Sequence, residues 1–160
     1  MTGKSSETAI RVRAIEEKDE HAWRSLWDGY LTFYKQTLPE DVKTLTWNRI
    51  CLSQDGYSAF VAEASDQRLI GFAICLLHPS TWTARPYCYL EDLFVAEEAR
   101  GLGAGRALVE AVYGFAEALS CPRVYWVTEE TNQTARALYD RVARFSGHVQ
   151  YRKQGDWAWR

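Results

Sequence analysis

The sequence predicts an α+β fold, in which a mixed and mostly antiparallel central sheet of about seven strands is flanked by about four helices. Two observations carry this prediction. Residues 57–63 and 69–77 are apolar segments joined by a short polar turn, which is typical of an antiparallel hairpin. Residues 86–95 and 124–128 are also strand-like, and the helical segment between them is typical of a crossover connection.

The start of the chain supplies one strand and one long helix. Apolar and arginine residues alternate over 10–14, which predicts a first strand. Aromatic and leucine side chains then recur every three or four residues on one face of a helix: Trp23, Leu26, Trp27, Tyr30, Leu31 and Tyr34. Trp23 and Leu26 fit the core, whereas Tyr30 and Tyr34 fit a pocket wall because each phenol has a polar tip.

Three more helices and two more strands follow from similar patterns. Pro39 predicts the start of a second helix that ends near residue 51, with Leu45 and Ile50 facing inward. Apolar residues with helical spacing extend over 108–119 until Pro122. Thr131 or Asn132 then caps a last helix, and strands are expected at 147–152 and 156–159.

Length and composition indicate one domain, and they exclude several classes of protein. We expect residues 1–8 to be a disordered lead and residues 9–160 to fold as a unit. The formal net charge of −2 provides no broad basic surface for nucleic acid. No apolar run approaches the length of a membrane helix, and no signal-peptide core is present, so a cytoplasmic protein is expected. The four cysteines have no metal-binding spacing, which favours reduced thiols and predicts no metal site.

The most informative segment is a strand followed by a glycine-rich turn. Residues 89–95 read Tyr-Leu-Glu-Asp-Leu-Phe-Val, and residues 100–106 read Arg-Gly-Leu-Gly-Ala-Gly-Arg before an amphipathic helix. Such glycines let several backbone N–H groups at a helix N-terminus converge on one anion, and two flanking arginines suit a phosphate. No lysine follows, which disfavours a nucleoside triphosphatase loop. A plain structural turn is the alternative.

Three motifs together resemble the GNAT superfamily of acetyl-CoA-dependent N-acetyltransferases. They are the 89–95 strand, the Arg-Gly-x-Gly-x-Gly turn, and Thr-Asn-x-x-Ala-x-x-Leu-Tyr-Asp over 131–140. Within the superfamily the segments are most similar to the spermidine/spermine and thialysine acetyltransferases and the fungal histone/polyamine acetyltransferases. The resemblance implies a single acetyltransferase domain over 9–160, and a strand pair that splays near residues 93 and 126 to admit the cofactor.

The resemblance also implies the residues that bind acetyl-CoA. The strand would offer main-chain groups to the pantetheine arm, and the turn would hold the pyrophosphate. Asn132 would contact the cofactor or a bound water, although it could also be an ordinary helix cap. The expected cofactor-binding set is Leu93, Phe94, Val95, Arg100, Gly101, Leu102, Gly103, Ala104, Gly105, Arg106, Asn132 and Tyr139.

Acetylation of an amine requires a base, because an alkylamine is mostly protonated at neutral pH. Glu91 is the candidate, acting directly or through a water, with burial raising its pKa. Alternatively, it pairs only with an arginine such as Arg85. Strand alternation places Glu91 and Asp92 on opposite faces unless a bulge intervenes, so the sequence predicts a bulge. The resemblance implies that Asp92 also holds a cationic substrate; a structural salt bridge is the other interpretation.

Tyr139 is the candidate general acid. A phenol and a departing thiolate have comparable basicity, so a tyrosine can supply the proton that the thiolate needs. The alternative is a packed core tyrosine. No Ser-His-Asp or Cys-His arrangement is evident, which favours direct transfer over an acyl-enzyme.

The predicted function is transfer of an acetyl group to a primary amine of a polyamine, a lysine-like amino acid or a peptide lysine. Glu91 and Asp92, with Trp27, Tyr30 and Tyr34, form the expected substrate-binding set. The alternatives are acetylation of a non-cationic amine and an idle acetyl-CoA-binding sensor. The aromatic segment Asp156-Trp157-Ala158-Trp159 suggests strand pairing between subunits, hence a homodimer.

Overall fold

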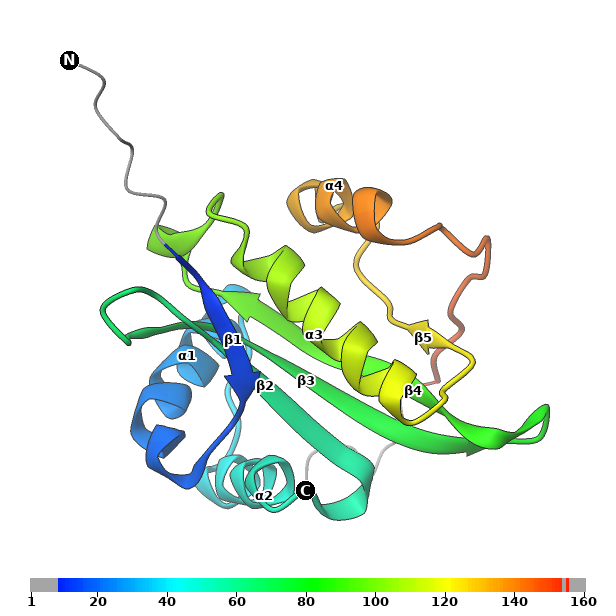
Figure 1. Cartoon of the computed structure of the whole chain (residues 1–160), viewed down its shortest axis with the longest axis horizontal. Coiled ribbons are helices and arrows are strands. Elements are labelled where there is room, and N and C mark those ends of the chain that lie inside the picture. The colour runs from blue at the N-terminus through cyan, green and yellow to red at the C-terminus, as the bar shows by residue number, and fades with distance from the viewer. Residues whose placement is uncertain (1–8, 154, 156–160) are drawn as a thin grey trace.

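Five strands form one sheet in the order β1-β2-β3-β4-β5 (Figure 1). The computed structural model describes residues 9–153 and 155. Within that part the strands are β1 (Arg11–Ala14), β2 (Tyr57–Glu63), β3 (Leu69–Ser80), β4 (Thr83–Val95) and β5 (Val124–Tyr125). Neighbouring strands are antiparallel except β4 and β5, which are parallel. The mixed, mostly antiparallel sheet that the sequence predicts is therefore confirmed.

Among residues 9–153, four α-helices accompany the sheet: α1 (Glu20–Phe33), α2 (Glu40–Cys51), α3 (Ala104–Ala118) and α4 (Gln133–Val142). Strand alternation shows which face each helix covers. Phe72 of β3 packs against Trp23 and Trp27 of α1, whereas an added Cβ at its neighbour Gly71 would lie 3.3 Å from Leu108 of α3. Helices α1 and α3 therefore cover opposite faces, and α4 lies beside α3 (Figure 1).

The α1 face of the sheet is packed with aromatic rings. Trp23 is fully buried, with its ring centroid 5.3 Å from Trp27 and 5.4 Å from Trp47 of α2. Trp27 stacks in turn on Tyr30 at 5.2 Å. The helical stripe thus passes from core residues to a tyrosine with a polar tip, as the sequence predicts.

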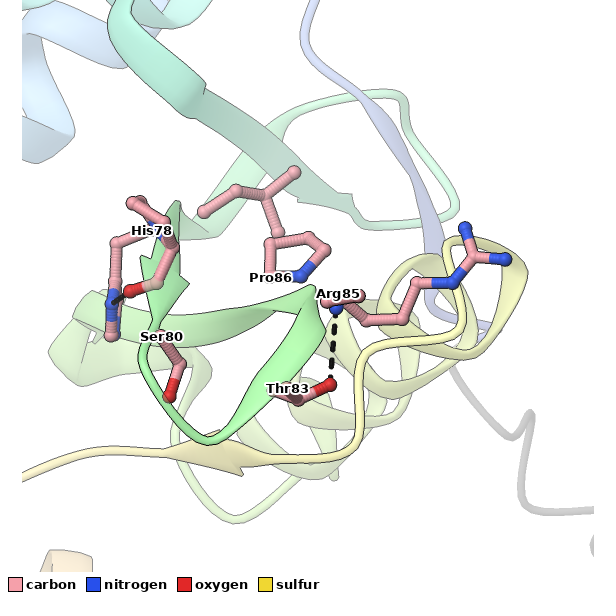
Figure 2. A pocket seen from close by; sticks show the side chains of 8 residues that line it. His78, Ser80, Thr83, Arg85 and Pro86 are labelled. Atoms are coloured by element: carbon pink, nitrogen blue, oxygen red, sulfur yellow. Dashed lines mark hydrogen bonds between the residues drawn. The ribbon is translucent and has the colours of Figure 1, made fainter.

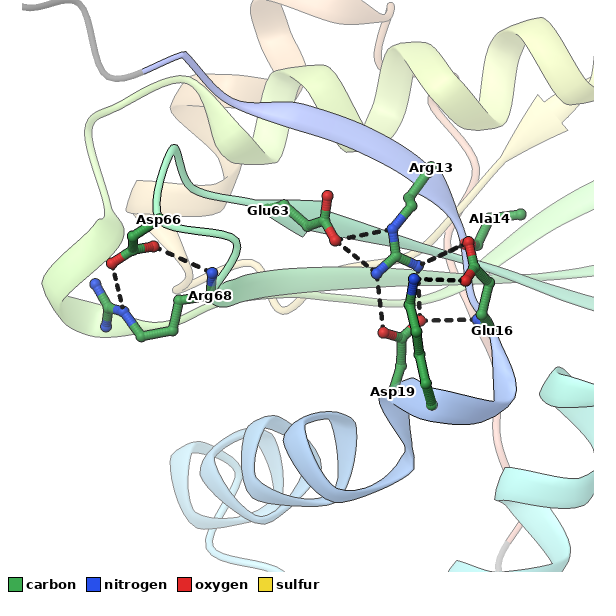
Figure 3. A network of polar contacts seen from close by, with 8 residues as sticks. Arg13, Ala14, Glu16, Asp19, Glu63, Asp66 and Arg68 are labelled. Carbon is green, nitrogen blue, oxygen red and sulfur yellow. Dashed lines mark hydrogen bonds and ion pairs between the residues drawn. The ribbon is translucent and has the colours of Figure 1, made fainter.

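Arg13 joins β1 to β2 and to the start of α1 through ion pairs (Figure 3). Its guanidinium lies 2.7 Å from a carboxylate oxygen of Asp19 and 2.6 Å from one of Glu63. Burial alone would raise the pKa of Asp19, but hydrogen bonds from Arg13 and from the Glu16 amide outweigh it and hold that pKa below its ordinary value. This polar cluster fixes where α1 begins.

Two expectations for the C-terminal part need correction. Residues 147–152 form no strand: Gly147 has a left-handed backbone with φ of 78°, and Val149 and Tyr151 are exposed, so no apolar face is buried there. The strand expected at 124–128 ends at Tyr125. The described residues therefore contain five strands rather than seven. The strand expected at 156–159 and the lead at 1–8 lie outside the described residues.

One inward-facing residue of α2 was also wrongly predicted. Ile50 is buried as expected, but Leu45 is 46% exposed and Trp47 is buried in its place. Positions 47 and 50 are three apart and share a helix face, whereas position 45 is rotated roughly 140° away from position 50. Pro39 precedes the helix as predicted.

Candidate active site

A β-bulge interrupts the pairing of β3 with β4 at the two acidic residues. Ile74 pairs with Asp92 and the next residue, Cys75, pairs with Leu90, so Glu91 has no partner in β3. The extra residue breaks the regular alternation, and Glu91 and Asp92 both line one cavity. The predicted bulge is confirmed.

This cavity has a volume of about 610 Å³, within the usual range of small-molecule sites. We call it the carboxylate cavity. Residues from α1, α2, β2, β3, β4 and the C-terminal segment line it: Trp27, Tyr30, Leu31, Gln36, Leu38, Thr46, Arg49, Tyr57, Ile74, Glu91, Asp92 and Arg152. Four of the five residues expected to bind substrate are therefore brought together.

Asp92 is the better-enclosed carboxylate of the pair. The Tyr30 hydroxyl donates a hydrogen bond to it at 2.6 Å. Burial raises the pKa of Asp92 to about 7, opposed by the Tyr30 hydrogen bond and assisted by the charge of Glu91. Burial, with the neighbouring Asp92 carboxylate, raises the pKa of Tyr30 as well, so that phenol stays protonated. Asp92 therefore changes charge near neutral pH.

Glu91 keeps contact with solvent, yet the surrounding protein raises its pKa through partial desolvation. The ion pairs formed by the described residues do not include Glu91. Arg85, its suggested partner, lies at the β3–β4 turn, where its amide donates to Thr83 Oγ1 at 3.0 Å (Figure 2). The Glu91–Arg85 pairing is therefore absent from the described part of the chain.

The β3–β4 turn carries a second, smaller hollow of about 260 Å³, drawn in Figure 2. His78 lies there with Nδ1 2.8 Å from the Pro79 carbonyl and Nε2 2.7 Å from the Tyr125 hydroxyl. A carbonyl only accepts, so Nδ1 carries the proton and Nε2 accepts from Tyr125. The lining of this hollow contains no carboxylate. Both ring nitrogens of His78 are used in hydrogen bonds, one of which joins the β3–β4 hairpin to β5.

Tyr34 and Tyr139 lie outside the lining of the carboxylate cavity. Tyr34 follows α1, with its ring centroid 4.9 Å from that of Tyr30. Tyr139, on α4, packs edge-on against Trp126 at 5.2 Å. Burial, with a smaller contribution from Tyr34, raises the pKa of Tyr139 to about 12. The described residues offer no hydrogen-bond partner to its hydroxyl.

The strand expected to meet the cofactor has one unpaired edge. Leu93, Phe94 and Val95 pair with β3, whereas the pairing of β4 with β5 is confined, in the described chain, to Cys88 with Val124 and Tyr89 with Tyr125. From Glu91 onward, the β5 side of β4 is therefore free of strand pairing. The Val95 carbonyl accepts a hydrogen bond from Arg100 Nε at 3.2 Å.

The glycine turn after β4 has the geometry of an open anion site. Gly101 and Gly103 have φ of 79° and 89°, and an added Cβ at either would meet nothing within 4 Å. Gly103 is the N-cap of α3 and has no side chain to cover the N–H groups of the first turn. These groups and the helix dipole suit a phosphate, so the turn fits the pyrophosphate of coenzyme A.

The other residues expected at this turn have more varied surroundings. Arg100 and Arg106 are exposed, and Arg106 pairs with Glu110 one helical turn later at 2.8 Å. Leu102 is also exposed, whereas Ala104 is buried. Gly105 faces α4: an added Cβ would lie 3.1 Å from Leu138, so this glycine allows close helix packing.

Asn132 caps α4, accepting a hydrogen bond from the Ala135 amide at 3.2 Å. The cap interpretation is confirmed, and its role toward the cofactor stays a prediction.

Sequence reasoning missed the residues that complete the cavity on the side of α2. Arg49, Tyr57 and Arg152 belong to no recognisable motif. Thr46 and Arg49 are three residues apart, which places them on one helix face, but nothing in the sequence indicates that this face turns toward β4. The described residues contain no cluster of three or more His, Cys, Asp or Glu able to hold a metal ion. No helix among them has both the length and the apolar character needed to cross a membrane.

A sequence model described as "Acetyltransferase (GNAT) family" matches residues 20–145. The D-amino-acid N-acetyltransferase HPA3 of Saccharomyces cerevisiae is 42% identical over 149 residues, which cover 91% of each chain. The thialysine N-epsilon-acetyltransferase of Caenorhabditis elegans is 30% identical over 87 residues, covering 54% of this chain and 51% of the relative.

Solved structures share the fold at lower identity. A ribosomal-protein-alanine N-acetyltransferase from Brucella melitensis biovar Abortus 2308 superposes with a TM-score of 0.78 at 22% identity, over 92% of this chain and 99% of its own. The aminoglycoside N-acetyltransferase AAC(6')-Iy, solved in complex with CoA, gives 0.77 at 20% identity, over 96% and 99%.

Proposed function

The chain belongs to the acetyltransferase (GNAT) family, and we propose that it transfers an acetyl group from acetyl-CoA directly to an amine held in the carboxylate cavity. The observation that carries this assignment of the acceptor site is the β4 bulge, because of which Glu91 and Asp92 both line the same cavity. Two carboxylates are suited to bind an ammonium group and to remove its proton.

Acetyl-CoA would bind along the unpaired edge of β4 and at the N-terminus of α3. Leu93, Phe94 and Val95 would present main-chain groups to its pantetheine arm, and residues 100–106 would hold its pyrophosphate. The exposed Arg106–Glu110 pair contributes at most about 1 kcal/mol, so Arg106 is free to exchange Glu110 for a phosphate. The cofactor supplies a thioester, whose carbonyl carbon is activated toward a neutral amine.

Deprotonation of the acceptor falls to the two acidic residues. The raised pKa of Glu91 and the pKa of about 7 for Asp92 bring both bases closer to the working pH than ordinary carboxyls. A base with a pKa near the working pH combines a useful ionised fraction with a useful driving force for proton transfer. We assign Glu91 as the base that receives the amine proton and Asp92 as the group that holds the ammonium.

Tyr139 is the proposed acid for the departing thiolate. With a pKa of about 12 its hydroxyl is protonated throughout the neutral range, and that hydroxyl has no partner among the described residues. Cys75 and Cys88 are fully buried, and the partly exposed Cys51 and Cys121 lie outside the lining of the carboxylate cavity, so none of the four is placed to carry the acetyl group. This placement of the cysteines supports direct transfer.

Acceptors of several classes satisfy these requirements, including free amino acids, polyamines and lysine side chains of peptides. A non-cationic amine and a non-catalytic acetyl-CoA sensor are the remaining candidates. A homodimer also stays a prediction, because the segment on which it rests, 156–159, lies outside the described residues; light scattering of the full chain tests it.

The test is release of free thiol from acetyl-CoA in the presence of D- and L-amino acids, spermidine, a lysine peptide and a neutral amine. Release that depends on one acceptor class supports the transferase and identifies that class. If calorimetry shows tight binding of acetyl-CoA but no amine causes release of free thiol, the result would favour the non-catalytic sensor.

A further inference from the structure

The carboxylate cavity is lined by charges of both signs. Glu91 and Asp92 come from β4, whereas Arg49 comes from α2 and Arg152 from the C-terminal segment. A site for a simple cation has no need of guanidinium groups, which remain charged at every accessible pH. The two arginines therefore require an explanation that the acetyl-transfer chemistry does not provide.

The opposite charges in this cavity do not pair with each other. Arg49 uses its Nε to bind Asp55 at 2.9 Å, which leaves its two terminal NH₂ groups without a hydrogen-bond partner in the described part of the chain. Among the described residues, Asp92 accepts a hydrogen bond only from the Tyr30 hydroxyl, and Arg152 donates to Gln150 at 3.1 Å. Charges of both signs thus remain available to a ligand.

The Arg49 guanidinium is held in place as well as available. Its Cζ lies 5.8 Å from the centroid of the Tyr57 ring, and its Nε is bound by Asp55. Tyr57 itself lines the cavity. A guanidinium fixed at its Nε presents its terminal groups as a fork, the geometry that binds a carboxylate.

Electrostatics then discriminates between the acceptor classes. A polyamine bound through one end at Glu91 and Asp92 would bring its remaining positive charges toward Arg49 and Arg152, and like charges in a partly enclosed cavity repel. A zwitterion satisfies both groups at once. Its ammonium meets the β4 carboxylates, and its carboxylate meets the arginines.

We propose that the acceptor is a free amino acid bound as a zwitterion, with its carboxylate held by Arg49, assisted by Arg152. This inference rests on the proposed function of the cavity as the acceptor site. Arg49 is then a specificity-determining residue, which separates amino acids from amines that lack a carboxylate.

The experiment compares phenylalanine, as both enantiomers, with phenethylamine and phenylalaninamide, which have the same side chain without the carboxylate. Wild-type kcat/KM should favour at least one phenylalanine enantiomer over both analogues. Arg49→Gln should lower kcat/KM for that enantiomer by about 10- to 100-fold, the usual weight of a hydrogen bond to a charged group, and leave phenethylamine little changed. Arg49→Lys should recover part of the loss.

Two control variants separate carboxylate binding from structural damage. Asp55→Asn removes the Arg49–Asp55 ion pair, as Arg49→Gln does, but keeps the guanidinium. This variant should therefore retain the preference for the amino acid. Arg68→Gln removes another exposed Arg–Asp pair, with Asp66, away from the cavity lining, and should behave like wild type. Circular dichroism checks that each variant is folded.

Binding of phenylalanine and phenethylamine to the enzyme saturated with coenzyme A, measured by calorimetry, distinguishes the two ways in which the idea can fail. Equal wild-type activity on phenylalanine and phenethylamine, or equal losses for both in Arg49→Gln, overturns the proposal of a zwitterionic acceptor. The proposed acetyl-transfer reaction is not affected by that result. Phenylalanine binding that depends on Arg49 without any turnover supports the zwitterion and refutes the proposed reaction. If phenylalanine is neither turned over nor bound in a way that depends on Arg49, the proposal of a zwitterionic acceptor is overturned as well.

Discussion

Tyr139 combines partial burial with a hydroxyl that no described residue engages, and these properties define its expected role. Replacing it with phenylalanine removes one oxygen and keeps the ring on Trp126. If the phenol is the general acid, Tyr139→Phe should lower kcat by about 10²- to 10⁴-fold. Stopped-flow or steady-state thiol release gives kcat, and calorimetry with coenzyme A should show nearly unchanged affinity.

Tyr113 provides the matched control on α3. Its hydroxyl donates to the Val142 carbonyl at 2.9 Å, joining α3 to the end of α4. Tyr113→Phe should cost stability, about 1 kcal/mol for one hydrogen bond, without a comparable loss of kcat. Full kcat in Tyr139→Phe would refute the assignment.

The raised pKa of Asp92 predicts a specific dependence of stability on pH. Its carboxyl ionises at about 7 in the folded protein, against 3.8 ordinarily. Between these values the folded chain keeps a proton that the unfolded chain has lost, so the contribution of Asp92 to the free energy of unfolding is fully present below about pH 4 and is lost as the pH rises through 7. The full shift would correspond to roughly 4 kcal/mol, and solvent access to the half-buried side chain reduces it.

Asp92→Asn tests this linkage because asparagine can still accept from the Tyr30 hydroxyl but cannot ionise. Urea unfolding at pH 5 and pH 8 should show wild type losing more stability than the variant on going to the higher pH. Identical changes in the two proteins would mean that Asp92 ionises near its ordinary pKa.

At the scale of elements, the turn that begins α3 depends on a left-handed backbone. Gly103 has φ of 89° and open space where a Cβ would lie, so Gly103→Ala meets no atom but incurs backbone strain of about 1–2 kcal/mol. Gly114, within α3, also faces open space without a positive φ, and Gly114→Ala should raise stability by about 0.5–1 kcal/mol. Thermal unfolding should therefore shift in opposite directions for the two variants.

Coenzyme A affinity separates the roles of these glycines. Gly103→Ala should weaken it, because strain at the N-cap displaces the first-turn N–H groups, whereas Gly114→Ala should not. A loss of stability in Gly103→Ala with unchanged coenzyme A affinity would argue against this turn as the pyrophosphate site.

Local patterns predicted most of these elements, and longer-range packing decided the rest. The apolar run at 57–63 matches β2 at both ends, and the adjacent acids Glu91 and Asp92 correctly suggested a bulge. Residues 147–152 alternate like a strand, but alternation gives no strand where Val149 and Tyr151 stay exposed. Arg49 could not be assigned to the cavity, because its place depends on how α2 packs against the sheet.

At the scale of the whole molecule, the sheet separates a face packed by α3 from a face on which α1 meets the bulge of β4. The hydrogen bond from Tyr30 of α1 to Asp92 depends on where α1 sits, and the ion pairs of Arg13 with Asp19 and Glu63 fix the start of that helix (Figure 3). The side chains of Arg13, Asp19 and Glu63 are only 11%, 6% and 12% exposed. Stability and site geometry are thereby coupled.

Removing Arg13 should therefore be costly, because two nearly buried carboxylates would lose their partner. Arg13→Met should lower the free energy of unfolding by about 3–5 kcal/mol. Arg24→Met, which removes an arginine paired with the more exposed Glu20 and Glu40, should cost no more than about 1 kcal/mol.

The effect of Arg13 should also depend on pH. Because Arg13 holds the pKa of Asp19 low, its stabilising effect is present above the ordinary carboxyl pKa and is lost as the pH falls. Urea unfolding should therefore show the stabilities of the two variants converging toward about pH 3. Equal losses at neutral pH would mean that the pairs of Arg13 contribute no more than exposed ones.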